Sequence, residues 1–273
     1  MDELRIKKIL MCGTPRSGTT FLTQVIKKLT NHSTLNGKIQ VQKTHGYSVG
    51  SHNPAVWKLL SYRDPRDVIC SYANSILLRE IESGVIPSDP EATRYFIATH
   101  RLFLRPQAYQ LDFRAYRWEH DVEGLPVTFI KYEDWFPFNT QSLVEHLVPT
   151  LKNIDPSYEI SDEDVRRIVD DSSFMKNKKV KFMRTGKSVW RETLLSLPPQ
   201  QAHELAYFMD QMCGDFIIEL GYEKDRSWKE QFKSGTVCWT MGESFDPKQK
   251  TSGLSEESAE DMSRLIRKGL LRN

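Results

Sequence analysis

Apolar residues in this chain form short runs that alternate with longer segments of helical spacing. Residues 9–12 are an apolar run that ends at Gly13, a pattern typical of a buried parallel strand. Further strand candidates follow at residues 38–45, 56–62 and 125–134. Helices are expected at residues 21–29, from residue 64 onward, over most of 87–120 with a break at Pro106, and at 140–151, 162–171, 200–220 and 258–271. This alternation predicts an α/β fold, a mostly parallel sheet of about four to five strands with helices on both faces.

The loop between the first strand and the first helix is the best candidate for an anion site. Gly13 and Gly18 fit the phosphate-binding pattern G-x-x-x-x-G-K-[ST], and Thr20 occupies the hydroxyl position. Thr19 replaces the lysine of that pattern, and Arg16 is the cation within the loop. We therefore expect a P-loop-like loop that holds a phosphate-like group but lacks the lysine for β- and γ-phosphates. A purely structural loop of the same shape is the alternative.

Charged residues follow three of the predicted strands. Arg16, His45 and Arg63 each lie at or just beyond the carboxyl end of a predicted strand, at the edge where parallel sheets bind ligands. Asp64 and Pro65 are suited to begin a helix, which makes the turn at Arg63 a second strand-to-helix connection with a cation. Two separate anion sites suit a nucleotide that carries both a 5′ diphosphate-like group and a 3′-phosphate.

Charge, cysteine content and hydropathy narrow the class of protein. The formal net charge is only +2, which argues against a general binder of nucleic acid. No apolar stretch approaches the length of a membrane span, and the N-terminus leads into the first strand with no room for a signal peptide. The four cysteines form no C-x-x-C pair, which favours a reducing compartment and argues against structural zinc.

Six short segments, in order along the chain, resemble motifs of the sulfotransferases that use 3′-phosphoadenosine-5′-phosphosulfate (PAPS). T-P-R-S-G-T-T-F-L (14–22) is similar to the 5′-phosphosulfate loop of that family, and R-D-P-R-D-V-I-C-S (63–71) to its 3′-phosphate motif. K-T-H (43–45) resembles the segment with the catalytic base in the cytosolic branch. The remaining matches are K-Y-E-D (131–134), S-S-F (172–174) and F-M-R-T-G (182–186) with Trp190 downstream.

The resemblance implies a role for each matched residue. His45 would be the general base, and Lys43 and Arg16 would stabilise charge at the 5′ phosphosulfate. The expected contacts with PAPS and its product, 3′,5′-adenosine bisphosphate (PAP), are Arg16, Ser17, Gly18, Thr19, Thr20, Phe21, Arg63, Ser71, Tyr132, Ser172, Phe174, Phe182, Met183, Arg184, Thr185 and Gly186. No metal is required by this chemistry, and the sequence has no evident cluster of metal ligands.

The resemblance also implies an organisation and a setting. We expect a single sulfotransferase domain over residues 1–273, in which residues 87–120 cover the acceptor site and 234–273 form a C-terminal extension. Its expected partner is a small-molecule acceptor with a hydroxyl or amine group, with no nucleic acid and no membrane. A cytoplasmic monomer or homodimer is expected.

Some features depart from the family, and other functions stay open. Only residues 21–42 separate the first loop from Lys43, and Trp190 lies one residue closer to the glycine than is usual, so the identity of the acceptor does not follow. A nucleotide kinase or hydrolase with a degenerate P-loop is one alternative. A non-catalytic nucleotide-binding protein is the other.

Overall fold

A computed structural model describes residues 6, 8–32, 37–45, 47, 53–82, 104–135, 140–172 and 190–232. Contacts between residues divide the chain after Ser234, and every described residue belongs to the first unit. The predicted helix at 258–271 and the proposed extension at 234–273 lie outside the described residues. The assignment of residues 1–273 to a single domain therefore stays a prediction.

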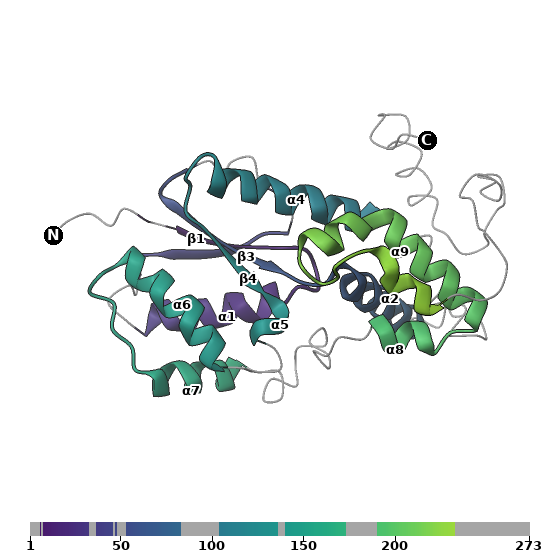
Figure 1. Ribbon diagram of the computed structural model, residues 1–273. Coiled ribbons are helices and arrows are strands. Elements are labelled where there is room, and N and C mark those ends of the chain that lie inside the picture. Colours follow the sequence, from purple (N-terminus) through teal and green to yellow (C-terminus); the bar gives the residue numbers. More distant parts are fainter. Residues whose placement is uncertain are drawn as a thin grey trace. The chain divides into compact units, whose positions relative to one another are not determined.

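Four parallel strands form the sheet, in the order β2-β1-β3-β4 (Figure 1). Their bounds are Gln40–Lys43 for β2, Lys8–Cys12 for β1, Val56–Tyr62 for β3 and Val127–Lys131 for β4. Met11 lies opposite Lys43 on one side and Leu59 on the other, so the carboxyl ends of β2, β1 and β3 meet at one edge. The predicted parallel α/β fold is confirmed.

The fourth strand is shorter than the sequence predicts. The structure ends β4 at Lys131, and residues predicted to continue it form the short helix α5, Tyr132–Trp135. Helical geometry buries both Tyr132 and Trp135 in the core, where a strand would have turned alternate residues to opposite faces. β2 is also shorter than predicted, although the Thr44 N–H still bonds to the Met11 carbonyl oxygen (2.9 Å) beyond its end.

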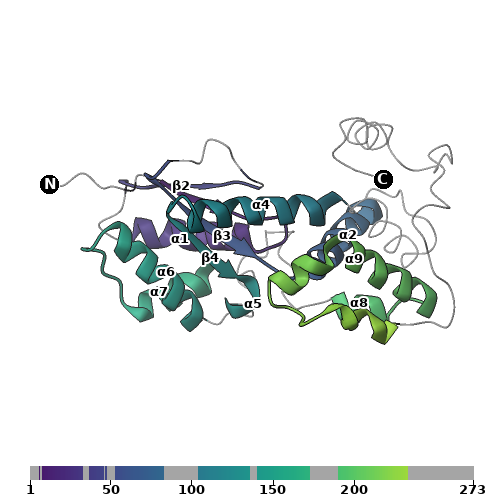
Figure 2. The same ribbon diagram turned by 45° about the horizontal axis from the view of Figure 1, so that its top comes forward.

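Three helices cover one face of the sheet. They are α1 (Thr19–Asn31), α6 (Thr140–Ile154) and α7 (Asp162–Ser172), and they lie together on that side in both ribbon views (Figures 1 and 2). Ile9, Met11 and Leu59 point into this core, packed against apolar residues of α1 such as Leu22 and Ile26. The apolar residues of 21–29, which recur at helical spacing, are thus buried against the sheet.

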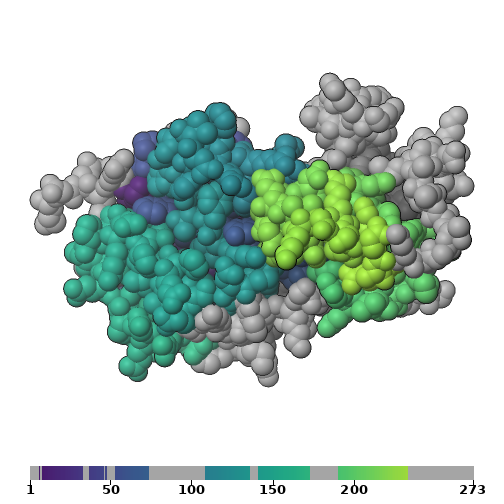
Figure 3. Space-filling model, viewed as in Figure 1, coloured from purple at the N-terminus to yellow at the C-terminus, as the bar shows by residue number. Residues whose placement is uncertain are grey.

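The other core begins on the opposite face of the sheet. Its helices are α2 (Pro65–Glu82), α4 (Leu104–Asp121), α8 (Trp190–Leu195), α9 (Pro199–Glu219) and the 3₁₀ helix η3 (Arg226–Phe232). Leu10, Cys12 and Leu60 point into this core, which contains Tyr109 and Phe113 of α4. Figure 3 shows η3, in yellow-green, against the green of α9. Neither α8 nor η3 was predicted from the sequence.

Pro106, the expected break between two helices, lies near the beginning of α4, and the residues that would form the preceding helix lie outside the described ranges. Helix α4 begins at Leu104 and continues through Pro106 to Asp121. Pro106 lies in the first turn, where the backbone N–H groups have no partner within the helix, so its missing donor costs no hydrogen bond. Among the helices in the described ranges, none is long and apolar enough to cross a bilayer.

Candidate functional site

The loop that joins β1 to α1, residues 13–18 (here the glycine loop), has a backbone that requires glycine at both ends. Gly13 and Gly18 have positive φ angles of 136° and 83°, and Arg16 adopts φ 77°. A Cβ on Gly18 would lie 2.6 Å from Trp135 Cζ2, and one on Gly13 would collide with the Ser61 carbonyl oxygen. The positive φ of a non-glycine residue, Arg16, is a local strain of the kind that is concentrated at functional sites.

Hydrogen bonds within the glycine loop hold its shape. The Ser17 N–H and hydroxyl both donate to the Thr14 carbonyl oxygen, at 3.2 and 2.8 Å, and the Ser61 hydroxyl donates to the Ser17 carbonyl oxygen. Ser17 and Thr19 are buried, whereas Thr20 is half-buried. The Ser17 hydroxyl, predicted to contact the donor, is thus bonded inside the loop in this structure.

The amino end of α1 faces the same loop. Gly18 occupies the N-cap position without a side chain to cap the helix, and the first turn contains no acidic residue. The first N–H groups of a helix carry a partial positive charge and bind anions readily. The arrangement predicted from the sequence, a strand followed by a glycine-containing loop and a helix, is present.

Lys43 and His45, from the end of β2, lie against the glycine loop. Lys43 Nζ donates to Thr20 Oγ1 (3.1 Å), and His45 Nδ1 lies 3.1 Å from the Gly13 carbonyl oxygen. A carbonyl oxygen only accepts, so we assign the hydrogen to Nδ1. In the neutral imidazole, Nε2 then carries the lone pair that a general base needs. Both side chains are exposed and accessible to a substrate.

Residues 63–67 (here the arginine turn) connect β3 to α2 and contact the glycine loop directly. Arg63 Nη1 donates to the Arg16 carbonyl oxygen (3.2 Å), and Arg16 Nε donates to the hydroxyl of Ser71 in α2 (2.9 Å). The structure therefore brings together the cations that the sequence places after the first and third strands.

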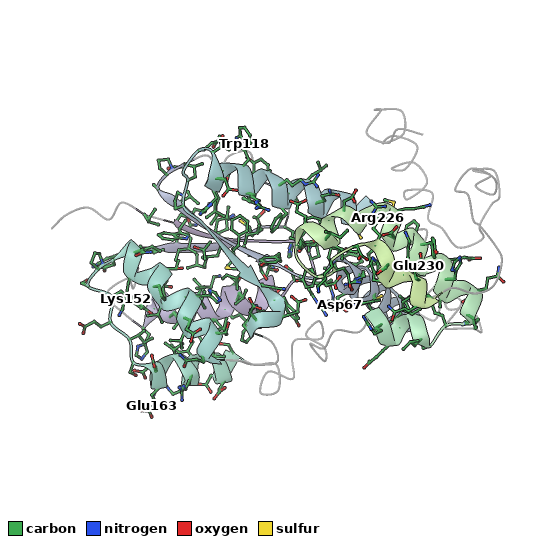
Figure 4. The ribbon with its side chains drawn as sticks, viewed as in Figure 1. Asp67, Trp118, Lys152, Glu163, Arg226 and Glu230 are labelled. Carbon is green, nitrogen blue, oxygen red and sulfur yellow. The ribbon has the colours of Figure 1, made fainter. Side chains whose placement is uncertain are left out.

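Arg63 is buried, at 5% exposure, and has clear structural contacts. Its Nη2 lies 3.5 Å from Asp67 Oδ2, and its guanidinium lies 4.4 Å from the ring centroid of Tyr132. Asp67 is therefore the acidic partner of Arg63 within the turn. The other acid, Asp64, pairs with Arg66 through Nη2 at 2.7 Å. Figure 4 shows Asp67 at the beginning of α2.

Two residues that sequence reasoning did not single out hold the arginine turn in place. The Tyr109 hydroxyl accepts from the Arg63 N–H (2.7 Å) and donates to the Arg63 carbonyl oxygen (2.8 Å). Glu133 accepts from the Asp64 N–H (3.3 Å) and from the Tyr222 hydroxyl (2.6 Å). Burial raises the pKa of Glu133, although the Tyr222 hydrogen bond opposes this shift. Glu133 could have been identified from the sequence, because it belongs to the K-Y-E-D segment. Tyr109 could not, because nothing distinguishes it from the many other aromatic residues of its segment.

A second buried cation stabilises the arginine turn from the side of α8 and η3. The Arg66 guanidinium lies 3.9 Å from the Trp190 ring centroid and 4.7 Å from that of Trp228, and its Nη1 donates to Glu223 (2.7 Å). The backbone N–H of Trp190 donates to Asp67 Oδ1 (2.9 Å). Trp190, identified through its place in the F-M-R-T-G motif, therefore anchors the turn from a distant part of the chain.

Phe21 and Tyr132, two aromatic residues predicted to contact PAPS, are largely buried. Phe21 is 2% exposed and stacks on Trp135, with ring centroids 5.1 Å apart and planes 7° from parallel. Tyr132 meets Trp135 edge to face at 5.0 Å. The Ser172 hydroxyl donates to the Ile168 carbonyl oxygen inside α7 (2.7 Å). The other predicted contacts in this region lie outside the described residues: Phe174, Phe182, Met183, Arg184, Thr185 and Gly186.

The acceptor cover predicted at residues 87–120 is described only from Leu104 onward. Tyr109 and Phe113 of α4 belong to the core that faces Leu60, and Tyr109 reaches the carboxyl end of β3. Contact of this segment with an acceptor stays a prediction. In the described ranges, no group of three or more His, Cys, Asp or Glu side chains is placed to hold a metal ion.

Comparison with known proteins gives a structural match but no sequence match. No model of a known protein family matches the chain, and no curated protein matches it. The solved structure of retinol dehydratase with androsterone and inactive cofactor PAP matches with a TM-score of 0.54 and 16% identity, over 77% of this chain and 81% of that one. Retinol dehydratase with retinol and PAP matches with a TM-score of 0.52 and 16% identity, over 78% and 82%. At this identity the likeness establishes the fold alone, and that fold agrees with the mostly parallel α/β sheet expected from the sequence.

Proposed function

We propose that this protein is a sulfotransferase that transfers a sulfuryl group from PAPS to a hydroxyl or amine of a small-molecule acceptor. The observation that carries the proposal is the convergence of Arg16, Lys43 and His45 on the glycine loop. An anion-binding loop, cations and an exposed imidazole at one place are what in-line transfer of an anionic group needs.

The residues present fit a donor with separated anionic groups. The amino end of α1, with Arg16 and Lys43 nearby, suits the 5′ phosphosulfate. The arginine turn, with Ser71, suits the 3′-phosphate through charge-assisted hydrogen bonds, and Arg184 is a further proposed contact on the basis of the motif resemblance alone. Tyr132 and Phe21 pack together with Trp135 in one aromatic group. The bound donor supplies a sulfuryl group attached to a phosphate that can leave.

The proposed chemistry assigns distinct tasks to the side chains around the loop. His45 accepts the proton of the acceptor at Nε2, while Nδ1 stays hydrogen-bonded to the Gly13 carbonyl oxygen. Lys43 and Arg16 stabilise the negative charge that develops on the phosphate side as the bond to sulfur breaks. His45 therefore acts on the acceptor, and the cations act on the leaving group.

The alternatives account less well for these residues. A nucleotide kinase or hydrolase would use a lysine at the position of Thr19 to reach the β- and γ-phosphates. A non-catalytic nucleotide-binding protein would have no use for an exposed imidazole held in one tautomer beside the loop. The crystal structures of retinol dehydratase contain PAP together with androsterone or retinol, which supports PAP as a ligand and a small molecule as acceptor. A cytoplasmic location and a monomer or homodimer remain part of the proposal.

A thermal-shift experiment tests the donor. PAP, at about one hundred times its Kd, should stabilise the protein by about 2.7 kcal/mol without magnesium, and ATP should stabilise it much less. Stronger stabilisation by ATP that depends on magnesium would favour the kinase. A panel of phenols, alcohols and amines with sulfur-labelled PAPS then tests for transfer, and binding of PAP without any transfer would favour the non-catalytic alternative.

A further inference from the structure

Tyr47, two residues after His45, is bound at both its backbone and its side chain by α4. Its N–H donates to Asp112 Oδ1 (2.9 Å), and its hydroxyl donates to Glu119 Oε1 (2.9 Å). Its ring meets that of Tyr116 edge to face, with centroids 5.1 Å apart. Three residues on one side of α4 thus hold a single residue of the segment that follows β2.

Glu119 is a rigid support for this contact because it is itself held by a buried charge. Its other carboxylate oxygen pairs with Lys58 Nζ from β3, and both side chains are fully buried, at 0% exposure. Removing one partner of such a pair leaves an uncompensated buried charge, so the pair holds its geometry strongly. Glu119 therefore links Tyr47 to a strand at the centre of the sheet.

The charge state of Tyr47 agrees with its role as donor. Burial, and then the hydrogen bond and negative charge of Glu119, raise the pKa of Tyr47 to about 12. The phenol therefore keeps its proton at neutral pH and donates it to the carboxylate.

His45 lies between two fixed points of the backbone. Upstream, the Thr44 N–H bonds to the Met11 carbonyl oxygen (2.9 Å), and downstream Tyr47 is bound to Asp112 and Glu119. The His45 side chain is exposed, and its one described contact is that of Nδ1 with the Gly13 carbonyl oxygen. Side-chain packing alone does not fix an exposed imidazole, so the position of the backbone decides whether this contact forms.

We propose that Tyr47 is a positioning residue for His45. Asp112 and the buried Lys58–Glu119 pair hold Tyr47, and Tyr47 in turn fixes the backbone next to His45. The imidazole therefore stays bonded to the Gly13 carbonyl oxygen, with Nε2 directed to the acceptor. The catalytic consequence rests on the proposed sulfotransferase function. The effect of Tyr47 on the position of the imidazole does not depend on that function, because it concerns only contacts within the chain.

The first test uses Tyr47→Phe, which removes the hydroxyl and keeps the ring. We expect kcat for sulfuryl transfer to fall about tenfold, with PAP affinity and acceptor KM changed by less than about twofold. In a His45→Ala background the same substitution should cause no further loss of kcat. A tenfold loss in that background as well would overturn the proposal, because Tyr47 would then act independently of His45.

Tyr207→Phe is the matched control. It removes a similar bond between a phenol and a carboxylate, from Tyr207 to Glu230 (3.2 Å), between α9 and η3. Glu230 is labelled in Figure 4. We expect its kcat to stay within about twofold of the wild type. An equal loss in both variants would show that a general loss of stability, rather than positioning of His45, explains the effect.

The second test needs no substrate. Long-range ¹⁵N–¹H spectra of the histidines, at a pH where His45 is neutral, should show the Nδ1–H tautomer of His45 in the wild type and a mixture of tautomers in Tyr47→Phe. Asp112→Ala, which removes the partner of the Tyr47 N–H, should have the same effect and serves if Tyr47→Phe folds poorly. An unchanged tautomer in both folded variants would overturn the proposal. If the wild type transfers no sulfuryl group, the proposed function fails, and these spectra still decide the role of Tyr47.

Discussion

Arg16 Nε donates a hydrogen bond to Ser71 Oγ at 2.9 Å, which joins the glycine loop to α2. The two residues are far apart in sequence and belong to the two motifs assigned to opposite ends of the donor. Arg16 and Ser71 can therefore each influence how the opposite end of the donor binds, because a shift of Arg16 also changes the surroundings of Ser71.

This contact predicts coupling between the two residues in donor binding. Arg16→Ala and Ser71→Ala should each weaken PAP binding, and the double variant should lose less than the sum, by about 0.5–3 kcal/mol, as expected for residues in contact. Calorimetric titration of all four proteins measures the coupling. Strictly additive losses would mean that the hydrogen bond has no role in binding.

His45→Ala should separate chemistry from donor binding. General-base catalysis is typically worth about 10²–10⁴-fold, so turnover should fall by that order while PAP affinity stays nearly unchanged. His32→Ala, at the carboxyl end of α1 where the side chain is 44% exposed, is the matched control and should keep normal turnover. Near-normal turnover of His45→Ala would assign the base to another residue, with His120 and His100 as the next variants to test.

Arg63→Ala should reveal which part of the donor the arginine turn binds. We expect PAP binding to weaken by about 1.5–3 kcal/mol, the value of a hydrogen bond to a charged group, and binding of AMP, which lacks the 3′-phosphate, to weaken far less. Arg63 also pairs with the buried Asp67, so the variant should be less stable and is best titrated well below its unfolding temperature. Equal losses of binding free energy for PAP and AMP would show that Arg63 has only a structural role.

Gly18→Ala should destabilise the protein more than Gly37→Ala does. Both glycines have positive φ, 83° and 73°, so both variants incur a cost of about 1–3 kcal/mol for that conformation. A Cβ at Gly18 also meets Trp135 at 2.6 Å, whereas at Gly37 it meets nothing within 4 Å. Overpacking should add about 1–3 kcal/mol at Gly18 only. Urea unfolding measures the difference, and equal free energies of unfolding would show that Trp135 moves aside without cost.

The pKa of Tyr132 predicts a loss of stability in alkali. Burial raises this pKa from its ordinary value of 10.0 to about 12, although the charge of Arg63 opposes the shift. Between these values Tyr132 ionises in the unfolded chain but not in the folded one, so stability falls as pH rises, by up to about 1.4 kcal/mol per pH unit from this group. Tyr132→Phe keeps the ring and removes the titration, so its melting temperature should fall less steeply above pH 10. Parallel curves for the two proteins would show that Tyr132 titrates alike in both states.

Local sequence determined the elements that carry the candidate site. Strand β1, the glycine loop and α1 follow from an apolar run, two glycines and apolar residues at helical spacing, which act within a few residues of one another. The alternation of strands and helices also determined the parallel sheet, and so placed Arg16, His45 and Arg63 at one edge.

Tertiary contacts decided what the local pattern left open. Residues 132–135 form a helix instead of a strand because burial of Tyr132 and Trp135 outweighs the local apolar pattern. The placement of Arg63 is set by Tyr109 and Asp67. The placement of the half-buried Tyr47 is set by Glu119, whose partner Lys58 lies 61 residues away from it in sequence.

The sequence by itself thus determined the parallel sheet and the types of residue at its edge, because backbone conformation and apolar spacing depend on near neighbours. Only the tertiary structure decided the orientation of His45, the contact of Arg16 with Ser71 and the support beneath Tyr47. Those contacts join residues from separate elements, and their distances depend on how the helices pack on the sheet.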